Sequence, residues 1–185
     1  HGVGPVLKPI RVEKEITELN HNDLEETLNP VYEAIAQVRA RLSPNVSLIG
    51  FAGAPWTVAT YMVEGGSSKT FNNVKAWATD DFRGFGELIK HLVEGITIHV
   101  MNQVGAGAEV IQLFDSWAGV LSPSEFDKWC IKPVREITER IKNKYPDVPI
   151  IGFPKGSGVN YQHYAEKTGV DCVSIDYTVP LDWID

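Results

Sequence analysis

Short runs of apolar residues alternate along the chain with longer segments in which apolar residues recur every three or four positions. The first run contains Val46, Leu48, Ile49 and Phe51, and its composition is typical of a strand covered on both faces. Three later runs have the same character. The pattern therefore predicts four strands, at 46–51, 110–114, 149–153 and 172–175.

The segments between these runs have helical periodicity. A helix expected over 22–42 begins at Asn22, a residue suited to capping with Glu25 three positions on, and contains Pro30, which should kink or restart it. Pro133 suits a first turn, so 122–144 is predicted to hold two helices. The longest segment runs from 81 to 104 and presents one apolar face, formed by Phe85, Leu88, Ile89, Leu92, Ile96, Val100 and Val104.

Strands that alternate with helices predict a parallel α/β sheet with right-handed crossovers. An open doubly wound sheet and a closed barrel both fit this order. No glycine fingerprint of a dinucleotide fold follows any of the four strands, which favours the barrel. A (β/α)8 TIM barrel takes about 250 residues. We therefore expect residues 1–185 to be a single domain, a partial barrel of about four parallel strands with flanking helices.

In a parallel barrel all strands end at one face, so four short segments should surround one mouth. Three of these segments carry a phenylalanine beside a small or polar residue, which suits a pocket for a large, flat, partly apolar ligand. Capping of the barrel core by Phe51, Phe114 and Phe153 is the alternative. Tyr61 lies one short helix beyond the first strand. Its hydroxyl either extends over the mouth, or its ring packs on the apolar face of that helix. The segments are 51–53, 114–116, 153–155 and 176–177.

The formal net charge of −7 argues against a general nucleic-acid surface, because no stripe of lysine or arginine is available to neutralise phosphates. The apolar runs are too short to span a bilayer, so we expect a cytoplasmic location. Cys130 and Cys172 fit neither a disulfide scaffold nor a zinc-ligand spacing and are interpreted as buried packing thiols. His91 and His99 are interpreted as structural, since no second type of metal ligand accompanies them.

Several motifs also resemble those of a known enzyme family. The first strand leads into GFAGAPWT at 50–57, continued by TYMVEGG at 60–66, and this long, specific match is unlike a lone glycine motif. Other matching stretches follow in order: Gly4-Pro5, QLFDSWAG at 112–119 and SIDYT at 174–178. Together they resemble the middle of the uroporphyrinogen decarboxylase family's chain, over nearly all 185 residues.

The resemblance implies an enzyme of haem biosynthesis that converts uroporphyrinogen III to coproporphyrinogen III by removing four acetate carboxyl groups. It implies a TIM barrel, a homodimer, and neither a metal nor an organic cofactor. By position in the motifs, Tyr61 and Ser116 match the family's substrate-binding tyrosine and serine. Phe51 and Phe114 fall beside the porphyrinogen in the same comparison.

Other family residues are not matched. The family's arginine pair and its pyrrole-binding aspartate correspond to positions before His1, and its histidine motif to positions beyond Asp185, so no catalytic residue is assigned here. Lys155 is the one cation at a predicted strand end. A substrate with eight carboxylates favours arginine forks in its pocket, so we expect this chain alone to be inactive.

Three alternatives stay open. Related barrels transfer methyl groups through a zinc-bound thiolate, which would use strand-end cysteine and histidine ligands. An aldolase-like barrel would use Lys155 as a Schiff-base lysine, provided that its side chain is desolvated. A third possibility is a non-catalytic fragment that binds a porphyrin or a partner chain through its exposed sheet edges.

Overall fold

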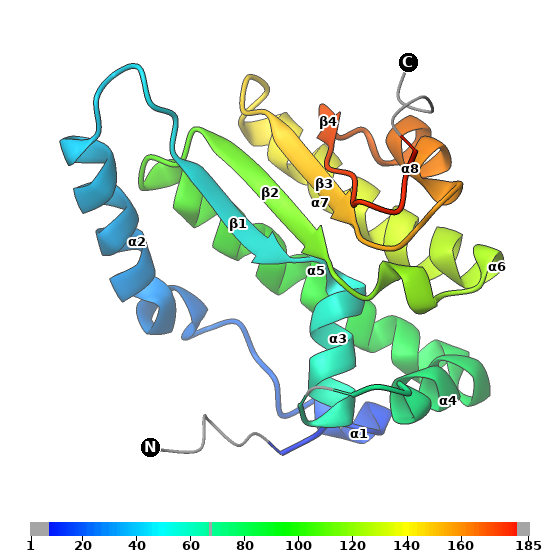
Figure 1. Ribbon diagram of the computed structural model, residues 1–185. Coiled ribbons are helices and arrows are strands. Elements are labelled where there is room, and N and C mark those ends of the chain that lie inside the picture. Colours follow the sequence, from blue (N-terminus) through cyan, green and yellow to red (C-terminus); the bar gives the residue numbers. More distant parts are fainter. Residues whose placement is uncertain (1–7, 67, 181–185) are drawn as a thin grey trace, which may run out of the picture.

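The computed structural model describes residues 8–66 and 68–180. Four parallel strands form one sheet in chain order (Figure 1). In this sheet Phe114 pairs with Phe153, and Ile151 pairs with Cys172. The parallel α/β architecture and the number of strands agree with the sequence-based prediction. The strands are β1 (Ile49–Gly53), β2 (Val110–Asp115), β3 (Ile150–Pro154) and β4 (Cys172–Val173).

Helices connect the strands, and the long helices α5 and α7 lie against one face of the sheet (Figure 1). No helix in the described part of the chain has the length and apolarity needed to cross a membrane. The helical elements are α1 (Glu13–Ile16), α2 (Leu24–Arg41), α3 (Pro55–Glu64), α4 (Asn72–Asp80), α5 (Phe82–Gly105), η1 (Ala118–Val120), α6 (Pro123–Phe126), η2 (Asp127–Ile131), α7 (Lys132–Lys144) and α8 (Asn160–Thr168).

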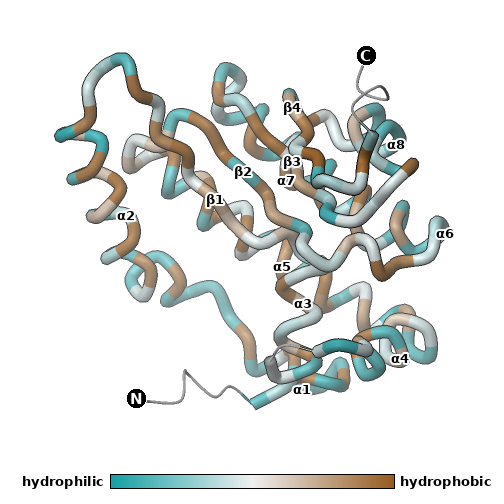
Figure 2. The backbone as a smooth tube through the Cα atoms, viewed as in Figure 1, coloured by the Kyte–Doolittle hydropathy of each residue, from teal (hydrophilic) through white to brown (hydrophobic). Residues whose placement is uncertain are grey.

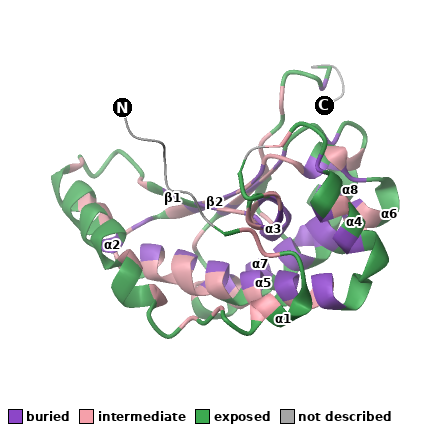
Figure 3. Cartoon of the chain, turned by 90° about the horizontal axis from the view of Figure 1, so that it is seen from below, coloured by how far each residue is buried: buried purple, intermediate pink, exposed green. Residues whose placement is uncertain are grey.

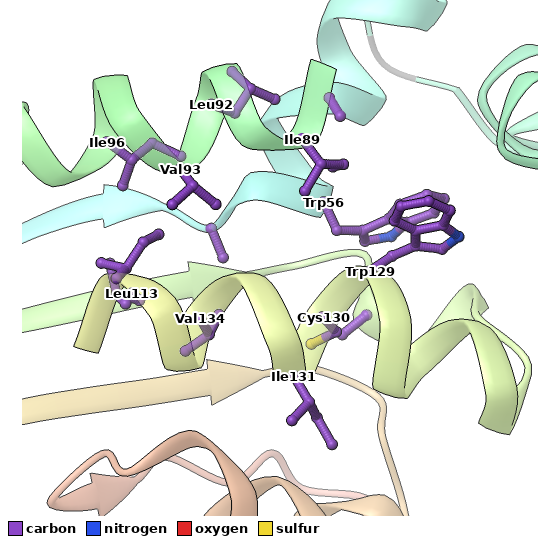
Figure 4. Packing of buried hydrophobic residues seen from close by; sticks show 14 of the residues in the cluster. Trp56, Ile89, Leu92, Val93, Ile96, Leu113, Trp129, Cys130, Ile131 and Val134 are labelled. Atoms are coloured by element: carbon purple, nitrogen blue, oxygen red, sulfur yellow. The ribbon is translucent and has the colours of Figure 1, made fainter. Parts of the chain in front are cut away.

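The hydrophobic core lies between the sheet and the helices on its covered face. Ile111 and Leu113 of β2 are fully buried there and belong to the same cluster as residues of α5 and α7 (Figure 4). The strands are apolar along most of their length (Figure 2). The opposite face is open, since Phe51 is 63% exposed and Ile49 is 49% exposed. The described residues therefore cover the sheet on one side, the side that faces outward in a barrel.

The structure confirms α5 as the longest regular element, at Phe82–Gly105. It begins after Asp81, whose carboxylate accepts a hydrogen bond from the Gly84 N–H at 2.9 Å and so caps the first turn. The predicted apolar face is buried except at Val104, which is half-buried, and Phe85, Leu88 and Val100 are fully inaccessible. Figure 3 shows this burial along the side of α5 that faces the sheet.

The segment around Pro133 forms a run of helical turns with a widened π turn, η2, in the middle. Pro133 lies in the first turn of α7, as predicted. Because proline has no N–H, the carbonyl of Trp129 cannot receive its usual i→i−4 hydrogen bond, and a wider turn at this point accommodates the loss.

One expectation for α2 is wrong, and a second is wrong in part. Asn22 does not cap the helix; α2 starts after Asp23, and the Asn22 N–H donates instead to Asn20 Oδ1 at 3.0 Å. Pro30 does not restart the helix, because α2 continues through it without interruption. The carbonyl that loses its N–H partner belongs to Glu26, and Glu26 and Pro30 are both exposed, so water replaces that bond at little cost. Only Tyr32 of α2 is buried, and most of the helix faces solvent (Figure 3).

The two cysteines differ in exposure. Cys130 is buried, as predicted, whereas the prediction for Cys172 is wrong because this residue is exposed. Its register with Ile151 places it on the open face of the sheet, and β4 is an edge strand of the described sheet. An apolar run in the sequence does not distinguish such a position from a covered one.

Close packing between β3 and α8 gives a stability prediction. A Cβ atom added at Gly152 would lie 2.5 Å from both Cε1 and the hydroxyl oxygen of the buried Tyr164. We expect Gly152→Ala to lower the free energy of unfolding by about 1–3 kcal/mol through overpacking.

The matched control is Gly86→Ala in α5, where a Cβ atom meets nothing within 4 Å. This change should stabilise the protein by about 0.5–1 kcal/mol, because glycine is a poor helix former. Urea unfolding followed by circular dichroism measures both changes. Equal effects of the two substitutions would contradict the packing described here.

Candidate functional site

The carboxyl ends of the strands meet at one edge of the sheet, as predicted, and backbone hydrogen bonds fix the loops that follow them (Figure 1). The Ala54 N–H donates to the Phe114 carbonyl at 2.8 Å, immediately before α3 begins at Pro55. The Lys155 N–H donates to the Asp115 carbonyl at 3.1 Å. The ends of β1, β2 and β3 therefore form one connected rim.

Three phenylalanines form a row across the open face of the sheet. The rings of Phe51 and Phe114 lie edge to face, with centroids 5.9 Å apart and an interplanar angle of 88°. Those of Phe114 and Phe153 are 6.0 Å apart at 82°. Because these side chains point away from the helices of the core, they present an apolar surface to the space above the sheet.

Tyr61 and Ser116 both adjoin Trp117, Tyr61 through its ring and Ser116 as its neighbour in the chain. Tyr61, on α3, is 43% exposed, and its ring centroid is 6.3 Å from that of Trp117. Ser116 is half-buried at the end of β2. Tyr61 also lines a cavity of about 530 Å³ together with Val58, Met62, Ile10, Leu19, Lys8, Gly65 and Gly66. The tyrosine is therefore accessible to a ligand while its ring rests on an aromatic neighbour.

Buried polar side chains support the turn that carries Ser116. The Thr57 hydroxyl donates to Asp115 Oδ1 at 2.6 Å and accepts the Trp117 N–H at 3.2 Å. The Trp117 carbonyl accepts the indole N–H of Trp56 at 3.0 Å. These bonds join α3 to the end of β2, so they fix Ser116 relative to the helix that carries Tyr61.

Asp115 is fully buried, and its environment is unusual for a carboxyl group. Burial raises its pKa from the ordinary value of 3.8 to about 6, against the opposing effect of the hydrogen bond from Thr57. Among the described residues, Oδ2 has no partner in hydrogen-bond geometry. Two further titratable groups adjoin it, the buried thiol of Cys130 and the buried phenol of Tyr164, whose pKa values are raised by burial.

The rim beyond β3 and β4 is held by Asp176. Its carboxylate accepts the Gly156 N–H at 2.5 Å and the Tyr161 hydroxyl at 2.9 Å. Hydrogen bonds, chiefly from the Thr178 hydroxyl, lower the pKa of Asp176 to about 2. Asp176 thus acts as an ionised anchor for the loop after β3, while the adjacent Tyr177 is 94% exposed.

The structure gives no support to two of the alternative chemistries. Lys155 is exposed, so the desolvation that a Schiff-base lysine requires is not found at its side chain. Within residues 8–66 and 68–180, no three His, Cys, Asp or Glu side chains are grouped to hold a metal ion. Cys130 is enclosed in the core, and Cys172 lies on the open face of β4.

The family model described as "Uroporphyrinogen decarboxylase (URO-D)" matches residues 1–185. The chain belongs to the uroporphyrinogen decarboxylase family. A curated uroporphyrinogen decarboxylase from Rhodospirillum rubrum is 46% identical over 182 residues, which are 98% of this chain and 52% of that protein. One from Wolbachia sp. subsp. Brugia malayi is 48% identical, over 98% of this chain and 51% of that protein.

The chain thus spans about half the length of the curated uroporphyrinogen decarboxylases it matches. Among solved structures, a methyltransferase from Methanosarcina mazei aligns with a TM-score of 0.63 and 18% identity, over 88% of this chain and 55% of that one. This likeness concerns the fold. It agrees with the assignment of the chain as part of a (β/α)8 barrel of the uroporphyrinogen decarboxylase family.

The support beneath the site was not predicted from the sequence. Thr57 and Asp115 are both within family motifs, but their contact joins residues 58 positions apart. The available signal was a carboxylate at the end of a mainly apolar strand, where a covered strand end would bury it. No sequence pattern predicted the role of Trp117, although its ring and backbone link Ser116 to α3.

The raised pKa of Asp115 predicts a pH-dependent stability. The folded protein retains a proton at Asp115 that the unfolded chain releases above its ordinary pKa of 3.8. Stability should therefore fall as the pH rises from about 4 through about 6, by about 3 kcal/mol once the group is ionised.

Asp115→Asn keeps an oxygen acceptor for Thr57 and cannot ionise. Urea unfolding at about pH 4 and about pH 7 should show that the unsubstituted protein loses about 2.4 kcal/mol more than this variant, because the unfolded carboxyl is already partly ionised at pH 4. Asp147→Asn, at an exposed position, serves as the control. The same pH dependence in the Asp115→Asn variant and the unsubstituted protein would show that Asp115 does not titrate in this range.

Proposed function

We propose that the protein is a uroporphyrinogen decarboxylase, which converts uroporphyrinogen III to coproporphyrinogen III by removing four acetate carboxyl groups. The observation that carries the proposal is the row of Phe51, Phe114 and Phe153, with Ser116 two residues after Phe114 and Tyr61 against the ring of Trp117. It occurs at the carboxyl edge of the sheet, in a chain that matches the family along its whole length. A ligand site in a parallel α/β barrel is expected at this edge.

The chemistry of the substrate supports this assignment. Protonation of a pyrrole carbon makes the ring an acceptor for the electron pair left by the departing carbon dioxide, so we propose that neither a metal nor an organic cofactor takes part. The protein must then bind the macrocycle, donate a proton and stabilise charge. We assign binding of the ring to Phe51 and Phe114, and hydrogen bonding to the substrate to Tyr61 and Ser116.

The small number of cationic side chains at the rim bears on whether the isolated chain can catalyse the reaction. The substrate carries eight carboxylates, whereas the chain has a formal net charge of −7 and the rim has Lys155 as its strand-end cation. Repulsion of this kind weakens binding of the substrate, and the few cations at the rim leave the reacting groups without the charges that would position and stabilise them. We therefore propose that the isolated 185-residue chain binds uroporphyrinogen without decarboxylating it at an enzymatic rate, and that further cations complete the site.

We also propose that residues 1–185 act as one domain of a cytoplasmic homodimeric enzyme. Family membership and the soluble-type composition support the location. The homodimer is proposed from the resemblance to the family alone.

The function is tested by anaerobic titration of uroporphyrinogen into the chain and its Tyr61→Phe and Ser116→Ala variants. Each variant should bind about tenfold more weakly, because it loses a hydrogen bond to a charged substrate group. Tyr145→Phe, a half-buried tyrosine at the end of α7, and Ser124→Ala, an exposed serine, are the matched controls.

Decarboxylation is followed in parallel by release of carbon dioxide. Weaker binding in both variants, with unchanged controls, supports the site. Binding without turnover supports the proposal that the isolated chain forms the substrate-binding site but lacks some of the cations needed for catalysis. Turnover by the isolated chain at the rate of a complete enzyme would refute its proposed inactivity, and failure to bind uroporphyrinogen at all would refute the site.

Exposure of the sheet face predicts association of the isolated chain. Sedimentation velocity over a range of concentrations should give a sedimentation coefficient that rises with concentration, because large apolar residues are exposed on the open face and β1 and β4 are edge strands of the described sheet. Phe51→Ser should reduce this dependence, and Tyr177→Ser, which changes an exposed aromatic residue off the strands, should not. A compact monomer at every concentration would argue against association through this face.

A further inference from the structure

Gln103, a buried residue of α5, binds both backbone groups of Phe51. Its Oε1 accepts the Phe51 N–H at 3.0 Å, and its Nε2 donates to the Phe51 carbonyl at 2.9 Å. Phe51 belongs to β1, an edge strand of the described sheet. One side-chain amide thus replaces the two hydrogen bonds that a neighbouring strand would otherwise make at this residue.

This pairing fixes the orientation of the Gln103 amide. The backbone N–H of Phe51 is a donor, so it must face the amide oxygen, and the NH2 group must face the carbonyl. The same NH2 nitrogen lies 3.0 Å from Nε2 of His99, one helical turn earlier in α5. Gln103 therefore presents a donor to His99.

The protonation state of His99 follows from its two neighbours. Because Nε2 faces a donor, it must carry a lone pair, which places the single ring proton on Nδ1. Nδ1 lies 3.1 Å from the Tyr32 hydroxyl of α2, which can accept that proton's hydrogen bond. The contacts are thus satisfied by one neutral tautomer of His99.

We propose that Gln103 and neutral His99 are positioning residues for the substrate pocket, which hold Phe51 at the end of the aromatic row and release it when His99 is protonated. The proposal rests on the function proposed above for its link to substrate, whereas the hydrogen-bond chain itself does not. A protonated Nε2 would place an N–H opposite the Gln103 NH2 group. To accept that proton the amide must turn over, and turning over breaks both of its bonds to Phe51.

The surroundings of His99 favour the neutral form. Burial lowers its pKa below the ordinary value of 6.5. A cavity of about 280 Å³ between α2 and α5 is lined mainly by apolar side chains and by three imidazoles. The titratable groups around His99 are Tyr32 on α2, with Glu25 acting on it, and the stacked pair His21 and His91.

The hydrogen-bond chain is tested by nuclear magnetic resonance of the ¹⁵N-labelled protein. The imidazole nitrogen shifts of His99 should report the Nδ1–H tautomer near neutral pH. Hydrogen exchange at the Phe51 amide, corrected for its intrinsic pH dependence, should become about tenfold faster as the pH falls from about 8 to about 5.

Two substitutions of His99 separate positioning from general packing. His99→Gln offers an oxygen acceptor to Gln103 but does not titrate, so Phe51 should stay protected and the pH dependence should disappear. His99→Leu offers no acceptor, and exchange at Phe51 should be about tenfold faster at every pH. His91→Gln is the matched control, because His91 lies on the same helix and lines the same cavity without contacting Gln103.

An Nε2–H tautomer of His99, a pH-independent Phe51 amide, or unchanged protection in His99→Leu would each overturn the proposal. So would a pH profile of His99→Gln identical to that of the unsubstituted protein. Uroporphyrinogen affinity, measured on the same samples, should weaken together with Phe51 protection at low pH and remain constant in His99→Gln. If the substrate does not bind under any condition, the proposed function fails, while the resonance data still decide the hydrogen-bond chain.

Discussion

The parallel pairing of the four neighbouring strands, in the order β1-β2-β3-β4, is the constraint on which the candidate site depends. It brings all strand ends to one edge and divides each strand into residues that face α5 and α7 and residues that face away. In β2, Leu113 is fully buried in the core, whereas its neighbour Phe114 joins the aromatic row. Core and site are therefore encoded by alternate positions of the same strands, and a register shift of one residue would exchange them.

Polar side chains from the covered side of the sheet give this edge its geometry. Thr57 joins the carboxyl of Asp115 to the backbone of Trp117, and Gln103 binds both backbone groups of Phe51. Such buried groups are costly unless they are paired, so they hold the backbone in few alternative positions. The accessible aromatic and hydroxyl groups can then be presented to a ligand with little freedom to move.

Sequence patterns predicted the elements of this fold because burial is periodic. The apolar face of α5 and the run that became β2 follow from the periods of a helix and a strand. The conformational preferences of single residues were less informative at α2. Asn22 and Pro30 are exposed there, so the capping preference of asparagine and the helix-breaking preference of proline have little effect on the structure. Cys172 was misjudged because an apolar run does not reveal whether both faces of its strand are covered.

The remaining features could not be predicted, because they depend on contacts between distant parts of the chain. Gln103 has no unusual sequence context, yet the fold places its amide against a strand residue 52 positions away. The sequence predicts a structural histidine at position 99, on one face of α5, and the fold places its ring between Tyr32 and Gln103. Its chemical state, however, follows from the direction in which Gln103 must point, and that direction is imposed by the backbone of Phe51. In the proposal, His99 binds no ligand itself, and its protonation state acts on the pocket through Gln103 and Phe51.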